Sequence, residues 1–537
     1  MDTKALRQKI LDLAIRGKLV PQDPNDEPAS VLLERIRQQK QQMVKEGKLK
    51  PKDIKNDSVI FVGEDNLHYE KFADGRVKCI EDEIPFDLPD GWAWSRIKNI
   101  SLIGTGATPL KSNSTYYKDG TIPWITSAAT SKASITLPTD YITNLALAET
   151  NCTIYPVGTL IIAMYGEGKT RGQISELDIE ACTNQACAAL RVLGESKPLR
   201  QYVKLYFQYS YGSLRQKAKG GQQPNLNQTI IADTLIPIPP YKEIDRVIMF
   251  ASDCFDLVDT IEEDKAAVLD GIGCIKKCIL DLAIRGQLVP QDPADEPASV
   301  LLERIRAEKE ELIKQGKIKR DKKESVIFRG EDNSYYEKIG DDVRCIDEEI
   351  PFDIPDTWEW VRLENCCSKE IRRGKSPKYT ERSGALVFAQ KCNTKYNGID
   401  VGLALYLDED TLSRYPADEY MQDSDVVVNS TGTGTLGRVG IYHTTDNHRG
   451  LPIVPDSHVT VIRAAHSFQA FYMYAFIKAN QSELEKKGEG STNQKELKPL
   501  TLKEMLIPVP PYSEQERIAA AITAVFSTIS AMEKSLN

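Results

Sequence analysis

Three short motifs contain residues that could support chemistry, and each lacks a residue that its chemistry requires. Residues 168–170 read GKT, as at the end of a phosphate-binding loop, but the glycine required at position 163 is Ala163. The IPPY and VPPY runs resemble an N-P-P-[YF] loop, in which Asn or Asp accepts hydrogen bonds from an amine. Ile238 and Val509 hold that position and offer no polar atom. The glycine-rich run from Ser430 lacks the G-x-G-x-x-G spacing. The sequence therefore predicts no catalytic residues.

The eleven cysteines and five histidines also form no ligand motif. The closest cysteine pairs are spaced differently from C-x-x-C, and they are Cys182/Cys187, Cys274/Cys278 and Cys366/Cys367. The histidines do not match H-E-x-x-H. We therefore expect buried free thiols, with no metal and no cofactor bound by this chain.

The most informative feature of the chain is an internal repeat. A 28-residue segment beginning at Ile10 recurs from Ile279 with only two substitutions. Shorter landmarks follow in each half: SVIF, IPFD, a Trp-x-Trp pair, and finally LIPIPPY or LIPVPPY. Between the Trp-x-Trp pair and the last landmark the two halves no longer match. A repeat of half a chain indicates two copies of one unit rather than the 20–50-residue repeats of a solenoid. Two constant frames thus carry two divergent inserts. This is expected for one scaffold that holds two recognition modules of different specificity.

The repeat predicts five segments along the chain. They are an N-terminal frame segment (1–91), a first insert (92–241), a central frame segment (242–357), a second insert (358–512) and a C-terminal frame helix (513–537). The expected fold class is mixed α/β, with two globular inserts separated by a pair of long antiparallel coiled-coil helices. The organisation is circular, because the second long helix is divided between the two ends of the chain.

Composition favours a folded protein with an acidic frame. Apolar residues make up 41% of the chain and aromatic residues 7%, and no apolar run approaches the roughly 20 residues of a membrane helix. The N-terminus has no apolar signal core, so we expect a cytoplasmic protein. The net charge is −9, yet residues 92–240 hold 14 Lys/Arg against 9 Asp/Glu and residues 358–511 hold 19 of each. The frame therefore suits protein partners better than phosphate groups.

A heptad pattern predicts the long helices. It runs over residues 243–285, where Gly271 and Gly273 favour a kink or break and Gly286 a stop. The pattern continues in the C-terminal helix and, by repeat, at the N-terminus. The predicted seam residues are Ile244, Val247, Ala251, Cys254, Val258, Ile261, Val268, Ile272, Ile275, Ile279 and Leu282, then Ile518, Ile522, Val525, Ile529 and Met532, and finally Leu6, Ile10 and Leu13.

Shorter elements are predicted in the frame and the inserts. The frame should hold helices over 29–46 and 298–315 and strands near 59–62 and 326–328. The inserts should hold strands over 159–164 and 425–429 and helices over 199–216 and 467–485. The paired tryptophans stand at matching frame positions, so we interpret them as core anchors rather than base-stacking residues: Trp92, Trp94, Trp358 and Trp360.

These phrases resemble the specificity subunits of type I restriction–modification enzymes. The resemblance rests on ILDLAIRGKLVPQ, on IPFDLPDGWAW before the first insert and on LIPIPPYKEIDRVI after it, and it covers essentially the whole chain. The first insert contains GTGATP, YYKDGTIPWI, GTLIIAMYGEGKTRG and TNQACAAL, which are typical of that family. The second insert departs at its start, where RRGKSPKY replaces the G-x-T-P phrase, and keeps DVVVNSTGTGTLGRVGI.

The resemblance implies that each insert is a target recognition domain for double-stranded DNA. Bases are read in the major groove by Arg, Lys, Asn, Gln and hydroxyl groups. The candidates in the first insert are Thr108, Lys111, Ser112, Tyr116, Tyr117, Lys169, Arg171, Gln222, Gln223 and Asn225. Those in the second are Arg372, Arg373, Lys375, Lys378, Tyr379, Lys391, Asn393, Lys395, Thr433, Thr435, Arg438, Asn493 and Gln494.

The resemblance also implies partners and leaves an alternative. The frame would dock two methyltransferase subunits, which would bind S-adenosylmethionine, and restriction subunits could join through them; the chain itself would not be an enzyme. Two different inserts predict an asymmetric, bipartite target with an unread gap. The alternative is a helical protein–protein scaffold with two ligand-binding domains and no nucleic-acid role.

Overall fold

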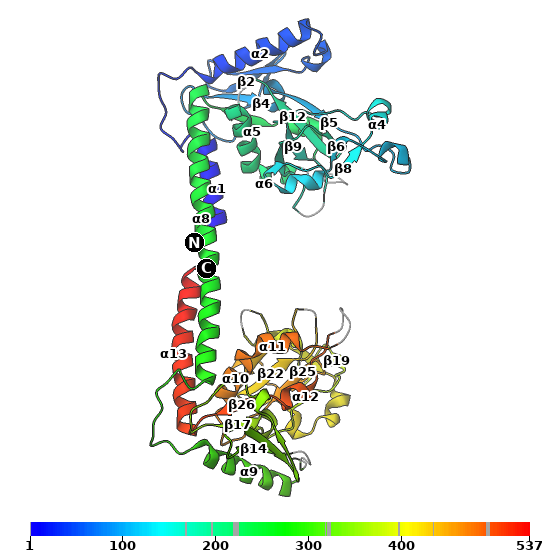
Figure 1. The fold of residues 1–537 in the computed structure, drawn as a ribbon. Coiled ribbons are helices and arrows are strands. Elements are labelled where there is room, and N and C mark those ends of the chain that lie inside the picture. Colours follow the sequence, from blue (N-terminus) through cyan, green and yellow to red (C-terminus); the bar gives the residue numbers. More distant parts are fainter. Residues whose placement is uncertain are drawn as a thin grey trace. The chain divides into compact units, whose positions relative to one another are not determined.

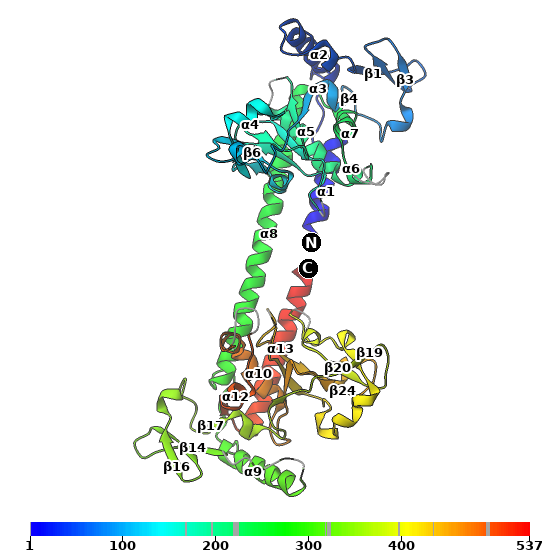
Figure 2. The same ribbon diagram turned by 90° about the vertical axis from the view of Figure 1, so that its right-hand side faces the viewer.

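The computed structural model forms two compact units, residues 1–265 and 266–537 (Figure 1; Figure 2). It describes residues 2–166, 169–194, 197–217, 225–316, 318, 320, 324–395, 398–432, 434–489 and 495–536. Each unit combines helices with several small sheets, which confirms the mixed α/β class.

Unit 1 places its sheets between short helices. The helices are α1 (Thr3–Ile15), α2 (Ala29–Lys45), α3 (Ile97–Ile100), α4 (Asn144–Glu149), α5 (Lys197–Tyr209), α6 (Tyr211–Lys217) and α7 (Gln228–Ala232). The sheets have the orders β1 (Ser58–Val62)–β2 (His68–Phe72)–β3 (Val77–Cys79); β5 (Ser101–Thr105)–β12 (Cys187–Val192)–β9 (Leu160–Ala163)–β10 (Ile174–Leu177)–β7 (Ser134–Ile135); β11 (Cys182–Thr183)–β6 (Ile122–Ile125)–β8 (Asp140–Ile142); and β13 (Leu235–Ile238)–β4 (Ala93–Arg96).

Unit 2 repeats the frame elements around a different insert. Its helices are α9 (Ala298–Lys314), α10 (Ala470–Ala479), α11 (Gln481–Lys486), α12 (Pro499–Lys503) and α13 (Tyr512–Leu536). The sheets have the orders β14 (Ser325–Arg329)–β15 (Tyr335–Ile339)–β16 (Asp342–Cys345); β17 (Glu359–Arg362)–β26 (Leu506–Val509); β18 (Arg372–Arg373)–β25 (Val459–Ile462)–β22 (Asp425–Asn429)–β23 (Val439–Tyr442); and β19 (Tyr379–Thr380)–β21 (Leu405–Leu407)–β20 (Leu386–Phe388)–β24 (Ile453–Pro455).

The long helix α8 (Tyr241–Ile284) contributes residues to both units and pairs with another helix in each. In unit 1, Arg7 near the start of α1 forms an ion pair with Asp259 of α8. In unit 2, Lys276 of α8 donates to Glu533 near the end of α13 (2.8 Å), while Gln291, just beyond α8, donates to Glu514 at the start of α13 (2.5 Å). The pair in unit 2 is therefore antiparallel.

The predicted seam is correct for about half of its positions. Nine of its residues are buried: Ile244, Val247, Ala251, Val258 and Ile272 on α8, Ile518, Ile522 and Ile529 on α13, and Ile10 on α1. Four are exposed, so their prediction is wrong: Val268 (48%), Ile275 (52%), Val525 (37%) and Met532 (54%). On a straight helix, residues that repeat every seven positions rotate around the axis by roughly 20° per heptad. The buried positions near the end of α8 therefore include Leu280 and Ala283. The helix continues through Gly271 and Gly273 without a break.

The other expected elements are present with small shifts in their bounds. The insert helix expected over 199–216 is divided into α5 and α6, and that over 467–485 into α10 and α11. The thiol prediction needs a larger correction, because the cysteines at four positions are exposed: Cys79, Cys274, Cys278 and Cys345. These residues lie on the solvent side of frame elements, where no core forms around them.

The tryptophans anchor the two frames by the same hydrogen bonds. Trp92 Nε1 donates to Glu243 (3.1 Å), and Trp358 Nε1 donates to Glu514 (2.9 Å). All four frame tryptophans are at most 8% exposed, which confirms their role as core anchors. Burial raises the pKa of the Glu243 and Glu514 carboxyl groups.

A buried ion pair also recurs in both frames. Arg96 contacts Glu70 at 2.7 Å in unit 1, and Arg362 contacts Glu337 at 2.8 Å in unit 2. The Arg362 guanidinium lowers the pKa of Glu337 to about 2. The frame is thus repeated in its contacts as well as in its sequence.

Candidate nucleic-acid interface

Each insert is held at its base by a pair of strands. In unit 1, β4 pairs with β13 in antiparallel register from Ala93↔Ile238 to Arg96↔Leu235. In unit 2, β17 pairs with β26 in the same manner. The first and last residues of each insert are therefore neighbours, and the loops in between extend from one fixed base.

The loop after β5 in the first insert depends on a glycine. A Cβ atom at Gly106 would lie 1.6 Å from the carbonyl oxygen of Thr183, so the two backbones approach more closely than any other residue allows. This approach places Thr108 beside the next loop, where its hydroxyl donates to Gln185 Oε1 (2.5 Å). Two polar side chains from separate loops thus form one exposed pair.

Side-chain hydrogen bonds fix the backbone of the same loop. Three alternate carbonyl groups of the loop accept side-chain hydrogen bonds. Tyr155 donates to the Thr105 carbonyl (2.9 Å), Trp124 to the Ala107 carbonyl (3.0 Å) and Tyr117 to the Pro109 carbonyl (2.6 Å). Tyr117 therefore supports the loop, and Tyr116 donates to Glu149 (2.9 Å). Lys111 and Ser112 stay exposed on it.

The second insert builds the same loop, although its sequence departs there from the family phrase. A Cβ atom at Gly374 would lie 2.1 Å from the carbonyl oxygen of Pro455. Ser376 Oγ contacts Ser457 Oγ at 3.4 Å, as Thr108 contacts Gln185. The phrase G-K-S-P therefore replaces G-A-T-P by a hydroxyl-for-hydroxyl exchange. The departure at the start of this insert is therefore one of sequence, and the exposed side chains differ.

Two further segments gather beside this loop in each insert. In unit 1, Met164 follows β9; its N–H donates to Ala186 (2.7 Å) and its carbonyl accepts from Leu226 (3.1 Å), which places Asn225 nearby. In unit 2, Ser430 follows β22 and forms the equivalent bonds with His458 (2.8 Å) and Leu497 (2.8 Å). Each insert thus brings four chain segments together through backbone and side-chain contacts.

Four cationic candidates of the second insert have acidic partners. Arg372 contacts Glu419 (2.7 Å) and Asp418 (3.3 Å), Arg373 contacts Glu496 (2.5 Å), Lys375 contacts Glu419 (3.5 Å) and Lys378 contacts Asp408 (2.9 Å). Lys369 also reaches Glu419 at 3.6 Å, and its burial lowers its pKa. Glu419 is therefore approached by three cations, Lys369, Arg372 and Lys375.

Arg438 and Asn393 hold two loops together. Arg438 donates to the carbonyl groups of Asn393 (2.8 Å) and Gly434 (2.9 Å), and the Asn393 amide donates back to the Arg438 carbonyl (2.9 Å). Asn393 is only 1% exposed. The expectation that Asn393 lies on an exposed loop is wrong, because its amide is used inside the insert.

The remaining candidates are exposed, partly buried or undescribed. The exposed ones are Lys169, Tyr379, Lys391 and Lys395, and the partly buried ones are Arg171, Asn225 and Thr435. Five candidates lie outside the described residues: Gln222, Gln223, Thr433, Asn493 and Gln494.

Two polar residues of the gathered loops were missed from sequence. Gln185 and His458 are exposed and follow the short strands β11 and β24. A usable signal was present, because each follows a short buried strand within a few residues.

The described residues also limit other kinds of site. Within them, no group of three or more His, Cys, Asp or Glu is arranged to hold a metal ion. None of their helices is both long enough and apolar enough to cross a membrane.

Comparison with known proteins identifies relatives along the whole chain. A family model described as type I restriction modification DNA specificity domain matches residues 89–270 and 355–537. The chain is 26% identical to the EcoEI specificity subunit of Escherichia coli, over 99% of this chain and 90% of that one. It is 28% identical to the EcoAI specificity subunit of the same organism, over 67% of this chain and only 62% of the relative.

A solved structure from work on complex assembly and conformational transition of the type I R-M system shares the fold. It matches with a TM-score of 0.50 at 17% identity, over 84% of this chain and 94% of that chain. The family model covers both inserts and the helices that follow them, which is more than half of the chain. The chain therefore belongs to the family of type I restriction–modification DNA specificity subunits.

Proposed function

We propose that this chain selects the DNA target of a type I restriction–modification complex, and that each insert reads one half of an asymmetric, bipartite sequence. The observation that carries the proposal is the shared loop construction of the two inserts. Gly106 and Gly374 fix equivalent loops, yet the exposed side chains beside them differ. Equivalent supports with different hydroxyl, amide and basic groups suit two readers of different base sequences.

An exchange of one insert tests this proposal. Residues 92–240 are replaced by the insert of another family member, and methylated sites are sequenced from cells that carry the hybrid and its methyltransferase. One half-site should change and the other should stay. The reciprocal exchange of residues 358–511 serves as the matched control. A methylation site that is palindromic and uninterrupted would contradict two independent readers.

We further propose that the frame binds two methyltransferase subunits, because it presents the same contacts twice. The partner would bind S-adenosylmethionine and carry the catalysis, restriction subunits could join through it, and the complex would work in the cytoplasm. Light scattering on the co-expressed complex measures the stoichiometry. Two methyltransferase copies per chain are expected, and a stable one-to-one complex at saturating partner would count against this arrangement.

We also propose a coiled-coil, circular layout in which α1 and α13 act as the two parts of one divided helix alongside α8. The antiparallel packing of α13 on α8 within unit 2 and the ion pair between α1 and α8 within unit 1 support it. In this layout the length of the helices would set the distance between the two half-sites.

A further inference from the structure

One exposed surface of the frame has no role in the core of its unit. In the β1–β2–β3 sheet, the register places Val59, Lys71 and Val77 in one row and Phe61, Tyr69 and Cys79 in the next. These six residues share one face, which we call the outer face of the small sheet. Val59, Phe61 and Val77 are 48%, 41% and 53% exposed. Three large apolar side chains thus meet solvent on this face, and Lys71 of the central strand lies between Val59 and Val77.

The corresponding sheet of unit 2 presents the same six residue types in the same rows. They are Val326, Lys338 and Val343, then Phe328, Tyr336 and Cys345. Val326, Phe328 and Val343 are 40%, 40% and 54% exposed. Even the ring packing recurs, since Phe61 stacks on Tyr69 and Phe328 on Tyr336 with centroids 5.9 Å apart in both cases.

The residue types on the inner face of these strands agree less well between the two units. Four of its positions differ between the units: Val62/Arg329, His68/Tyr335, Phe72/Ile339 and Lys78/Arg344. The inner positions that agree include Ile60 and Glu70, which pack on Trp94 and bind Arg96. Packing explains those agreements. It does not explain agreement at exposed apolar positions, which ordinarily tolerate polar residues.

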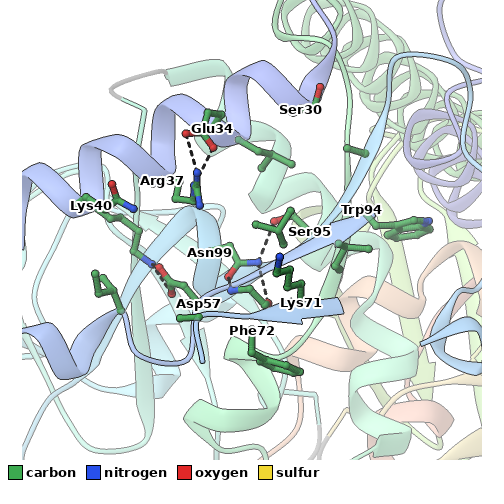
Figure 3. Close-up of a pocket in the computed structure, with 18 residues that line it drawn as sticks. Ser30, Glu34, Arg37, Lys40, Asp57, Lys71, Phe72, Trp94, Ser95 and Asn99 are labelled. Carbon is green, nitrogen blue, oxygen red and sulfur yellow. Dashed lines mark hydrogen bonds and ion pairs between the residues drawn. The ribbon is translucent and has the colours of Figure 1, made fainter. Parts of the chain in front are cut away.

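In unit 1, a groove of about 580 Å³ lies between α2 and the β1–β2 part of the small sheet (Figure 3). Leu33 and Arg37 of α2 line one side, and Val59 and Lys71 of the sheet line the other. Figure 2 shows β1 and β3 beside α2. The groove therefore shares Val59 and Lys71 with the outer face and also reaches Ile60, Phe72 and Trp94 on the inner side.

The turns that border the outer face are acidic in both units. Glu64 and Asp65 lie between β1 and β2, and Glu331 and Asp332 lie between β14 and β15; all four are exposed. Further acidic residues follow the last strand of each sheet, at 81–83 and 347–349. Such a border repels DNA phosphates, and it would equally repel the same surface of a second copy of this chain.

We propose that the outer face of each small sheet docks a protein subunit whose contact surface has an apolar centre bordered by Lys and Arg, one subunit per unit. Since two copies of the face exist, the occupant is the methyltransferase subunit of the proposed function, on which this inference rests. The apolar centre supplies the buried contact and the acidic border selects the partner by charge complementarity.

Paired substitutions test the docking surface. Val59→Lys with Val77→Lys alters unit 1, Val326→Lys with Val343→Lys alters unit 2, and a third chain carries all four changes. The matched control is Val62→Arg, because Val62 is 56% exposed on the inner side of the same strand and its counterpart is Arg329. Circular dichroism and the thermal midpoint confirm folding of each chain, and the DNA affinity of the isolated chain should not change.

Stoichiometry with the co-expressed methyltransferase gives the readout. The control should bind two copies, each two-substitution chain one copy, and the four-substitution chain none, or with affinity reduced tenfold or more. A four-substitution chain that still binds two copies overturns the inference and leaves the proposed function intact. A control that binds no methyltransferase overturns the proposed docking itself.

Thiol labelling locates the contact independently. Cys79 and Cys345 are exposed on the outer faces, whereas Cys274 is exposed on α8. Alkylation of the complex followed by mass spectrometry should show protection of Cys79 and Cys345. Unchanged labelling of both, with protection of Cys274 alone, would place the partner on the helix and contradict the proposal.

Discussion

At the scale of single residues, Thr108 and Gln185 form a hydrogen-bonded pair of polar side chains between two loops of the first insert. Gln185→Ala removes an amide that can bind adenine in a bidentate manner. We expect a loss of about 1–3 kcal/mol of base discrimination in the first half-site only. Competition binding with duplexes that carry single base changes measures it, and Gln38→Ala on α2 is the control. Equal losses in both half-sites would argue against a reading role.

Lys375 and Arg438 should respond differently to truncation. Lys375 is exposed, while both ends of the Arg438 guanidinium bind carbonyl groups of its own insert. Lys375→Ala should therefore weaken binding without unfolding; if Lys375 contacts a phosphate, the salt slope falls by about 0.9 for all sequences. Arg438→Ala should also lower the thermal midpoint. Binding titrations at several salt concentrations, with differential scanning calorimetry, separate the two cases.

The buried pair of Glu337 and Arg362 should make unit 2 sensitive to acid. The folded-state pKa of Glu337 is lowered to about 2, below its ordinary value of 4.5. Its contribution, about 3 kcal/mol at most, is present above pH ~4.5 and is lost as the pH falls towards 2. Glu337→Gln should lower the free energy of unfolding at neutral pH and reduce its dependence on pH in this range. Glu348→Gln, an exposed neighbour, should behave like the wild-type chain in urea titrations.

At the scale of elements, one glycine determines the position of the loop proposed to read DNA in each insert. Gly106→Ala would place a Cβ atom 1.6 Å from the Thr183 carbonyl, so the loop must move. We expect about 1–3 kcal/mol of destabilisation and loss of the first half-site. Gly374→Ala should act on the second half-site alone. Gly212→Ala and Gly384→Ala are the controls, because a Cβ atom there meets no other atom within 4 Å. Retained discrimination in Gly106→Ala would show that loop position is not critical.

The sequence predicts these elements better than it predicts their contacts. Alternating steps of three and four predict α8 within two residues at each end, because a heptad pattern specifies a helix directly. The apolar stripe of a straight helix rotates gradually around the helix axis. Whether Val268 and Ile275 are buried therefore depends on the path of the partner helix, and the heptad pattern does not specify that path. The equivalence of Gly106 and Gly374 was also missed, since a close backbone approach is visible only when two distant segments are seen together.

At the scale of the whole molecule, the circular layout predicts that the chain tolerates new ends. Joining Asn537 to Met1 by a short linker and opening the chain near Pro290 would place the new ends in an exposed loop rather than in a helix. The permuted protein should unfold in one cooperative thermal transition and keep its target. Opening the chain at Val258 instead, within the buried stretch of α8, is the matched comparison and should destabilise it.

The length of α8 makes a second prediction at this scale. Insertion or deletion of whole heptads near Lys265 should change the number of unread bases between the half-sites and leave both half-sites unchanged. Sequencing of methylated DNA measures this gap. A gap that stays constant while α8 changes length would mean that the helix does not set the separation.

The strand pairs at the base of each insert have a consequence for how such a chain can diversify. Because β4 meets β13 and β17 meets β26, each insert is a cassette whose two ends coincide in space. The frame segments on either side of each insert are nearly identical. The gene segments that encode them therefore offer equivalent sites for recombination. Under the proposed function, a single exchange of one insert would give such a gene a new half-specificity.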